Sequence, residues 1–329
     1  MRLAALLFAL VFPTLAVGQQ TLQQQIRSIA ANAHGKVSVA CSLPGTSLDC
    51  DLEATAHPPM QSVFKLPLAF TMLHQIEEGK FSLDQLIPFK DSDLILPKPF
   101  SPLQDKYPQA GVDVPLRELL RLTVSLSDNT AADILLRLAG GPQVVVDYLA
   151  SLGITGLHLQ DNEHALHRDH HVQYRNWFEP QAAVDLLRVI SDRSPLTPAN
   201  TALLLQWMTV HSGRLDGDLP PGTVVAHKAG TSFVDNGIAA ATNDIALITL
   251  PGGRRLAVAV FITDSTADES TRFQVIAKIG RAIYDAAMQN QGRSSSRIRG
   301  STLSTRLASS VSKPAGLGLL LKGSIASHV

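Results

Sequence analysis

The chain has 329 residues, of which 45% are hydrophobic and 17% charged, so it is long enough for a sizeable core in one or two domains. This composition excludes a disordered or fibrous protein. The formal net charge is zero, but seven of the 28 basic residues lie outside residues 19–290, whereas all 28 acidic residues lie inside that range. The body of the protein is therefore mildly acidic, which argues against a nucleic-acid-binding surface, because such a surface needs a basic face.

Residues 1–18 have the pattern of a signal peptide. A basic Arg2 precedes an apolar run, and the small residues Ala16 and Gly18 have the spacing of a signal-peptidase site. A membrane anchor is the alternative, but the apolar run is too short to span a bilayer and Pro13 interrupts it. We expect a mature chain that begins near Gln19, has no membrane span, and is periplasmic or secreted.

The two cysteines lie in a segment that alternates like a β-hairpin, over residues 36–40 and 48–52. A loop over residues 44–47 would place Cys41 directly opposite Cys50. In an exported protein the two form either a cross-strand disulfide or two free thiols, and both readings remain open. Two cysteines are too few for a thiolate metal cage, and the histidines at 164–171 lack the spacing of a zinc peptidase, so we expect no metal.

The hydrophobic periodicity predicts two kinds of region. Residues 61–209 read as a helical domain, because apolar residues recur at helical spacing between polar or proline starts. The chain ends, 19–60 and 210–290, are rich in Val, Ile, Ala and Thr and read as one α/β domain that closes with a helix over 271–288. Residues 291–329 are rich in Ser, Gly and Arg and read as a flexible low-complexity tail. We expect a site in the crevice between the two domains.

The central motif is Ser62-Val63-Phe64-Lys65. An apolar, helix-forming run follows Ser62, so Lys65 shares a helix face with it, and an amine lies beside a hydroxyl. A lysine of lowered pKa can take the proton of a serine and make it a nucleophile. Ser-x-x-Lys alone is a weak signal, since an exposed Ser and Lys on a helix is the commoner explanation.

Three later segments add polar residues suited to chemistry. Ser127-Asp128-Asn129 follows a predicted helix, Glu163 lies in a long polar loop, and Lys228-Ala229-Gly230 ends a predicted strand. Each also has a structural explanation: a helix cap, a solvated loop acid and an exposed strand end.

Together these motifs resemble those of the class A serine β-lactamases: Ser-x-x-Lys, Ser-Asp-Asn, a loop glutamate and Lys-Thr-Gly, in this order over residues 25–288. The resemblance implies an α/β plus all-α protein of the β-lactamase/DD-peptidase-like fold, with a five-stranded antiparallel sheet flanked by helices and an inserted helical domain. It implies hydrolysis of penicillins and cephalosporins without a cofactor, by a chain that acts as a monomer.

Finer features are similar to the PER- and VEB-type extended-spectrum branch. These are Gln61, Asp133, His167, the 172–177 stretch and the 227–232 stretch. In that branch the Asp and His interact and help to shape the active-site loop, so the resemblance implies the same role for Asp133 and His167.

The chain departs from the family at Ala229, where relatives carry Thr or Ser. That hydroxyl helps to hold the substrate carboxylate, and a hydrogen bond to a charged group contributes about 1.5–3 kcal/mol. Arg214 matches an arginine that serves the carboxylate in this branch, and Thr231 keeps a nearby hydroxyl. We therefore expect weakened binding rather than lost chemistry.

The resemblance also implies a role for each site residue. These roles are Ser62 as nucleophile, Lys65 as acylation base, directly or with Glu163 acting through water, Ser127 as proton relay, Lys228 as its electrostatic support, Glu163 as deacylating base, Asn129, Arg214 and Thr231 as substrate contacts, and the backbone N–H groups of Ser62 and Thr231 as oxyanion hole. Phe100 resembles the aromatic residue at the mouth of the cleft, although a lone Phe is as often part of a core.

Three rival functions share parts of the pattern. A penicillin-binding DD-peptidase lacks the loop glutamate, and a non-catalytic β-lactam sensor would stay acylated. An esterase on this fold would have no particular need for Asn129 or Glu163. The Glu163-x-x-Leu166 segment favours the β-lactamase.

Overall fold

The computed structural model describes residues 20–168 and 170–307. The described residues up to Ala287 form one compact unit, and those from Met288 onward belong to a second. The predicted signal peptide and the end of the predicted tail lie outside the described residues. None of the described helices has the length and apolar character needed to cross a lipid bilayer.

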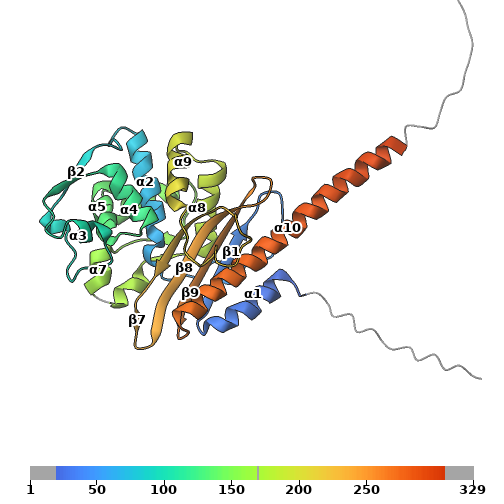
Figure 1. The fold of residues 1–329 in the computed structure, drawn as a ribbon, viewed down its shortest axis with the longest axis horizontal. Helices are drawn as coiled ribbons and strands as arrows, with labels where there is room; N and C mark the ends of the chain where they lie inside the picture. The colour runs from blue at the N-terminus through green and yellow to red at the C-terminus, as the bar shows by residue number, and fades with distance from the viewer. Residues whose placement is uncertain (1–19, 169, 308–329) are drawn as a thin grey trace, which may run out of the picture. The chain divides into compact units, whose positions relative to one another are not determined.

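The described residues contain more helix than strand (Figure 1). The α-helices are α1 (Leu22–Ala30), α2 (Lys65–Glu77), α3 (Pro102–Lys106), α4 (Leu116–Ser125), α5 (Asn129–Ala139), α6 (Pro142–Ser151), α7 (Glu163–Arg168), α8 (Pro180–Asp192), α9 (Pro198–Met208) and α10 (Glu269–Leu307). Short 3₁₀ helices are η1 (Ala31–Ala33), η2 (Gln61–Phe64), η3 (Asp91–Asp93) and η4 (His170–Arg175).

The main sheet has five strands, all antiparallel, in the order β1-β9-β8-β6, with β7 also paired to β8. These strands are β1 (Lys36–Ser42), β6 (Val225–Thr231), β7 (Val234–Asp235), β8 (Ile238–Thr249) and β9 (Arg255–Ser265). The predicted five-stranded antiparallel sheet is therefore confirmed. Strands from both ends of the chain meet in it, because β1 pairs with β9 over residues more than 200 positions apart.

Both faces of the sheet are covered. Almost every residue of β8 and β9 is buried, as expected for strands between two layers of helices. In Figure 1, α8 and α9 lie on one side of the sheet, and the part of α10 that belongs to the same compact unit, up to Ala287, lies on the other. The side chain of Arg272, near the start of α10, donates from Nε to Thr242 Oγ1 of β8 at 2.8 Å.

Helix α2 is the central helix of the helical region, because it is buried on all sides rather than along one stripe. Helices α4, α5, α6 and α9 all contact it. Its buried apolar residues are Leu66, Leu68, Ala69, Phe70, Met72 and Leu73. This burial carries the first residue of the helix, Lys65, into the interior.

The region predicted as all-helical also contains two small sheets. They pair β2 (Leu86–Phe89) with β3 (Val112–Pro115), and β4 (Leu157–His158) with β5 (Trp177–Phe178). Strands of two to four residues show no measurable alternation, so the periodicity gave no sign of them. The predicted polar loop likewise contains α7 and η4.

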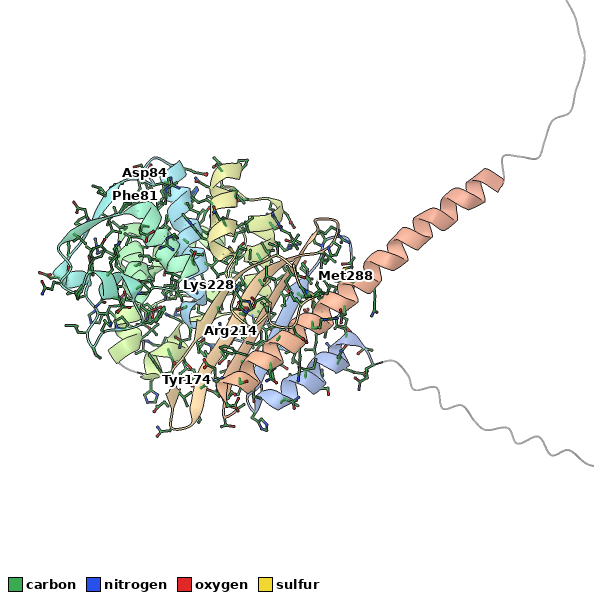
Figure 2. All side chains as sticks on the ribbon, viewed as in Figure 1. Phe81, Asp84, Tyr174, Arg214, Lys228 and Met288 are labelled. Atoms are coloured by element: carbon green, nitrogen blue, oxygen red, sulfur yellow. A yellow bond between two sulfur atoms is a disulfide. The ribbon has the colours of Figure 1, made fainter. Side chains whose placement is uncertain are left out.

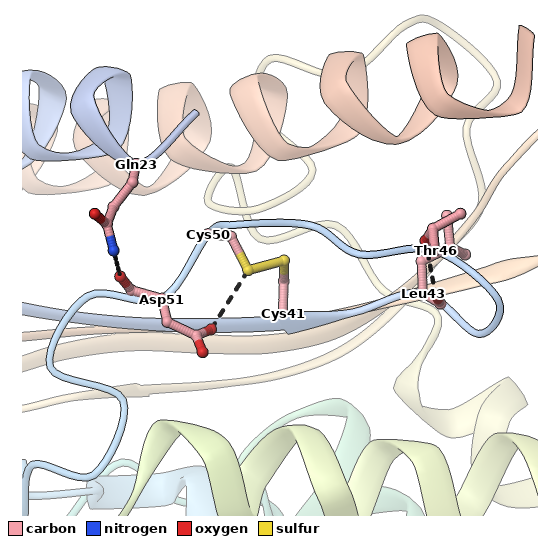
Figure 3. The surroundings of a disulfide bond; sticks show 6 residues. All are labelled: Gln23, Cys41, Leu43, Thr46, Cys50 and Asp51. Carbon is pink, nitrogen blue, oxygen red and sulfur yellow. Dashed lines mark hydrogen bonds between the residues drawn. A yellow bond between two sulfur atoms is a disulfide. The ribbon is translucent and has the colours of Figure 1, made fainter. Parts of the chain in front are cut away.

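The disulfide links Cys41 of β1 to Cys50 (Figure 3). Val39 and Leu52 exchange backbone hydrogen bonds of 2.7 and 3.0 Å, which is the register expected for the hairpin. The second strand is reduced to this single bridge. The free-thiol alternative is excluded, and the disulfide closes the loop over the edge of β1.

Helix α10 extends further than predicted. The sequence predicts a helix over residues 271–288 and a flexible tail after it, whereas the helix ends at Leu307. Residues 289–307 contain no proline, and a helix that has already formed propagates at little cost. The first part of the predicted tail is therefore helical.

Candidate active site

Ser62 and Lys65 meet at the junction of η2 and α2. Ser62 lies in the 3₁₀ turn, and Lys65 begins the α-helix directly after it. The Lys65 Nζ donates to Ser62 Oγ at 2.9 Å. Lys65 has no exposed surface, so the structure rules out the alternative of an exposed Ser–Lys pair.

Three further oxygen atoms surround the Lys65 ammonium group. They are the Ser127 carbonyl oxygen at 2.8 Å, Asn129 Oδ1 at 2.6 Å and Glu163 Oε1 at 2.9 Å. Glu163 is only 4% exposed, so this ion pair is largely shielded from water. Residues far apart in the sequence thus converge on the amine beside the serine.

Ser127 joins the two lysines. It lies between α4 and α5 with φ = 57°, a left-handed conformation that is costly for a residue with a side chain and typical of functional sites. Its carbonyl faces Lys65, while its Oγ accepts from Lys228 Nζ at 2.9 Å. The cap of α5 is Asp128, which accepts from the Ala131 N–H, so capping does not account for Ser127.

Glu163 begins α7, and its position is held by Asp133 of α5. The Asp133 carboxylate accepts the backbone N–H groups of Glu163 at 2.8 Å and His164 at 3.0 Å. Burial, followed by the neighbouring Glu163 charge, raises the pKa of Asp133 to about 7. Asp133 therefore contacts the loop through the backbone of Glu163 and His164. The side chain of His167 lies outside what the structure describes.

Further contacts tether the same loop, and the sequence analysis did not assign them. Gln61, next to the nucleophile, donates from Nε2 to Gln173 Oε1 at 2.7 Å. Asn176 Oδ1 accepts the Gln160 and Asp161 N–H groups at 2.9 and 3.0 Å. The stretch 172–177 was noted only as a similarity, because its partners are distant in the sequence.

Strand β6 forms the opposite wall. Lys228 is 3% exposed, and burial, with the charges of Lys65 and Arg214, holds its pKa well below the usual value. A Cβ atom at Gly230 would lie 2.7 Å from the Met60 carbonyl oxygen and 3.1 Å from the Ser62 nitrogen. Glycine is therefore needed here for β6 to approach the backbone of the nucleophile.

Arg214 lies beside the end of β6, and Figure 2 labels it together with Lys228. Its Nη2 donates to Thr231 Oγ1 at 2.6 Å, and its guanidinium lies 4.1 Å from the centre of the Phe273 ring. Arg214 thus presents a positive charge beside the hydroxyl that remains two residues after Ala229.

These groups line one cavity of about 590 Å³. Phe100 lines it with 62% of its surface exposed, and the core alternative for this residue was therefore wrong. Phe233, 67% exposed, also lines it. The predicted residues in the lining are Ser62, Phe100, Ser127, Asn129, Glu163, Arg214, Lys228 and Thr231. Within residues 20–168 and 170–307, no group of three or more His, Cys, Asp or Glu side chains is placed to hold a metal ion.

This geometry defines a serine hydrolase in which a buried lysine, and not a histidine, adjoins the nucleophile. A sequence profile described as the β-lactamase enzyme family matches residues 21–287. The chain belongs to this family and is a class A serine β-lactamase, which hydrolyses the cyclic amide of β-lactams.

Named relatives agree with this assignment. The extended-spectrum β-lactamase PER-1 of Pseudomonas aeruginosa is 40% identical over 266 residues, which are 80% of this chain and 86% of the relative. The β-lactamase VEB-1 of the same organism is 34% identical, over 86% of this chain and 95% of the relative. The crystal structure of a β-lactamase from Chitinophaga pinensis is 43% identical, with a TM-score of 0.77 over 81% of this chain and 99% of that one.

Proposed function

We propose that this β-lactamase works through a Ser62 acyl-enzyme that Glu163 deacylates. The observation that carries the proposal is the 2.9 Å contact of Glu163 Oε1 with Lys65 Nζ, itself 2.9 Å from Ser62 Oγ. In acylation Lys65 passes its own proton to Glu163 and takes the proton of Ser62. It then gives that proton through Ser127 to the leaving ring nitrogen and takes back the proton held by Glu163, which is again a carboxylate. In deacylation the Glu163 carboxylate takes a proton from water, and that water attacks the ester.

The remaining roles follow from the same contacts. The Ser62 and Thr231 N–H groups stabilise the oxyanion, which is supported by the close approach of β6 at Gly230. Ser127 carries a proton to the ring nitrogen that leaves, and the nearby Lys228 charge lowers the cost of that transfer. Asn129 binds the acylamide side chain of the substrate.

The proposal is tested by the time course of a chromogenic cephalosporin with Glu163→Gln. We expect one equivalent of product per enzyme and then a steady state slowed roughly 10²–10⁴-fold, because general-base catalysis contributes about that much. Glu269→Gln is the matched control, since Glu269 is the other acid in the cavity lining, and it should turn over as wild type does.

Two outcomes would replace the proposal. A single burst from wild type itself would favour a penicillin-binding DD-peptidase or a sensor that stays acylated. Continued rapid turnover by Glu163→Gln would mean that another group activates the water.

For the substrate range, we propose cephalosporins with bulky acyl side chains in addition to penicillins. PER-1 is named as an extended-spectrum enzyme, and the cavity of about 590 Å³ is open at Phe100 and Phe233. We assign Phe100 a contact with the substrate at the mouth of the cavity. A kcat/KM for bulky cephalosporins more than 100-fold below that for a simple cephalosporin would contradict this range.

We also propose export to the periplasm or beyond, removal of residues 1–18, and action as a monomer. The Cys41–Cys50 disulfide supports export, because such bonds persist in oxidising compartments. All groups of the site come from one chain. Mass spectrometry that shows a mature protein with a first residue other than Gln19 would contradict the proposed cleavage site. A dimer in light scattering would contradict the proposed monomer.

A further inference from the structure

His227 and Asp244 form a buried pair beneath the substrate-binding wall. His227 lies in β6 directly before Lys228, is 2% exposed, and its Nδ1 is 3.0 Å from Asp244 Oδ1 of β8. Asp244 has no exposed surface. Neither side chain lies within the ring of groups around Ser62, so the mechanism above leaves both unused.

The partners of His227 set its protonation. The second ring nitrogen, Nε2, is 2.6 Å from the carbonyl oxygen of Val210. Both neighbours can accept, so the geometry fits a ring whose two nitrogens both donate, as those of an imidazolium do. Burial by itself lowers the pKa of His227, but the Asp244 charge and the two hydrogen bonds raise it above its ordinary value.

The pair holds the segment that carries Arg214 at three points, one of which is the 3.4 Å hydrogen bond that Ser212 Oγ donates to Asp244 Oδ2. Four residues before Arg214, the Val210 carbonyl accepts from His227. One residue after it, the Leu215 N–H donates to Asp244 Oδ2 at 3.1 Å. Between them, the Arg214 N–H donates to Asp216 Oδ1 at 3.1 Å. Three of the contacts that fix this segment, and so help to direct the guanidinium toward Thr231, therefore end at the His227–Asp244 pair.

We propose that His227 is a positioning residue for substrate binding: its imidazolium, clamped between Asp244 and the Val210 carbonyl, fixes the 210–216 segment so that Arg214 meets the substrate carboxylate. The inference rests on the carboxylate-binding role proposed for Arg214. With Ala229 lacking a hydroxyl, binding relies on this arginine more heavily. The ring of His227 contacts Asp244 and Val210 rather than Ser62 or Lys65, so we expect it to act on KM and to leave kcat nearly unchanged.

Two substitutions of the ring separate its two hydrogen bonds. In His227→Gln the side-chain amide replaces Nε2 and still donates to Val210, whereas in His227→Asn it replaces Nδ1 and donates only toward Asp244. We expect His227→Asn to raise KM for a cephalosporin roughly tenfold, the effect of one lost charge-assisted hydrogen bond, with kcat within about twofold. His227→Gln should stay within about threefold of wild type.

The control substrate is the same cephalosporin with its carboxylate methylated. Its KM should be equal in all three proteins, because the ester offers Arg214 no charge. Equal rises of KM for acid and ester, or a fall of kcat, would overturn the inference, because His227 would then act through Lys228 or the general fold.

The variant Arg214→Ala separates the carboxylate-binding role of Arg214 from the positioning role of His227. If Arg214 binds the carboxylate, this variant removes the acid-over-ester preference, and adding His227→Asn to it should raise KM no further. A further tenfold rise would overturn the inference alone. An unchanged preference in Arg214→Ala would overturn the role of Arg214, and the inference with it.

A measurement on the wild-type enzyme covers the case in which a variant does not fold. Nitrogen-15 NMR of the histidine rings at neutral pH should show both nitrogens of His227 protonated. A ring whose Nε2 carries no proton, and which therefore cannot donate to Val210, would overturn the inference.

Discussion

The side chain at position 229 has no hydroxyl, although it stands between Lys228 and the Gly230 contact with the nucleophile. We predict that Ala229→Thr raises kcat/KM for carboxylated β-lactams at least tenfold, because one hydrogen bond to a charged group contributes about 1.5–3 kcal/mol. Steady-state kinetics would measure this. Ala229→Val adds the same volume without the hydroxyl and should bring no gain; an equal gain from valine would mean that packing, not hydrogen bonding, is responsible.

Asp133 links stability to pH. Its folded pKa of about 7 lies above the ordinary 3.8, so the folded state holds the proton more tightly than the unfolded state. Its contribution to the free energy of unfolding is therefore complete below about pH 4 and is lost as pH rises through 7. In Asp133→Asn this loss should disappear.

The check is urea unfolding of wild type and Asp133→Asn from pH 4 to 8. The stability of the variant relative to wild type should rise across this window. A constant difference would show that Asp133 ionises near its ordinary pKa and that neither its burial nor the neighbouring Glu163 raises it.

Among the elements, β6 must approach η2 closely, and Gly230 allows this. We predict that Gly230→Ala lowers kcat/KM about 10²-fold, because a Cβ 2.7 Å from a backbone oxygen forces β6 away from Ser62 and misplaces the oxyanion donors. Kinetics and circular dichroism would show lost activity in a folded protein.

A second glycine gives the control for that prediction. At Gly237, in the turn between β7 and β8, a Cβ meets nothing within 4 Å, but φ is +78°. Gly237→Ala should therefore lower the free energy of unfolding by about 1 kcal/mol through backbone strain and leave kcat/KM unchanged. Equal activity losses in the two variants would mean that the close approach at Gly230 is not the cause.

At the scale of the whole molecule, the catalytic unit ends before the basic C-terminal extension. The family profile matches residues 21–287, and the compact unit closes at Ala287. We predict that a chain ending at Asn290 keeps its kcat/KM within about twofold and its melting temperature within about 2 °C. A larger loss of either would show that residues 291–329 stabilise or complete the enzyme.

Much of this molecule could be predicted because its signals are local. Helices α4, α5, α6, α8 and α9 all lie within the predicted helical region, since amphipathic periodicity and capping residues act within one or two turns. The hairpin register at Cys41 and Cys50 followed from loop length alone. The sequence did not predict the short strands β2, β3, β4 and β5, and it placed the end of α10 too early, because no local signal marks these features.

The residues of the site also divide into those that a local motif marks and those that only the structure reveals. Ser62, Lys65, Ser127, Glu163 and Lys228 were predicted from their motifs and the family resemblance, and the structure brings them together. The sequence by itself thus determined which residues are chemically able to act, and which fold carries them.

Only the tertiary structure decided how those groups are arranged. It brings Lys65 Nζ within 2.9 Å of Glu163 Oε1, although the two residues are about a hundred positions apart in the chain. It also buries Lys228, and this burial lowers the pKa of the amine. It also placed the His227–Asp244 pair under Arg214. The physical reason is that distances and burial depend on how helices and strands pack, and no periodicity within one segment encodes the partners of another.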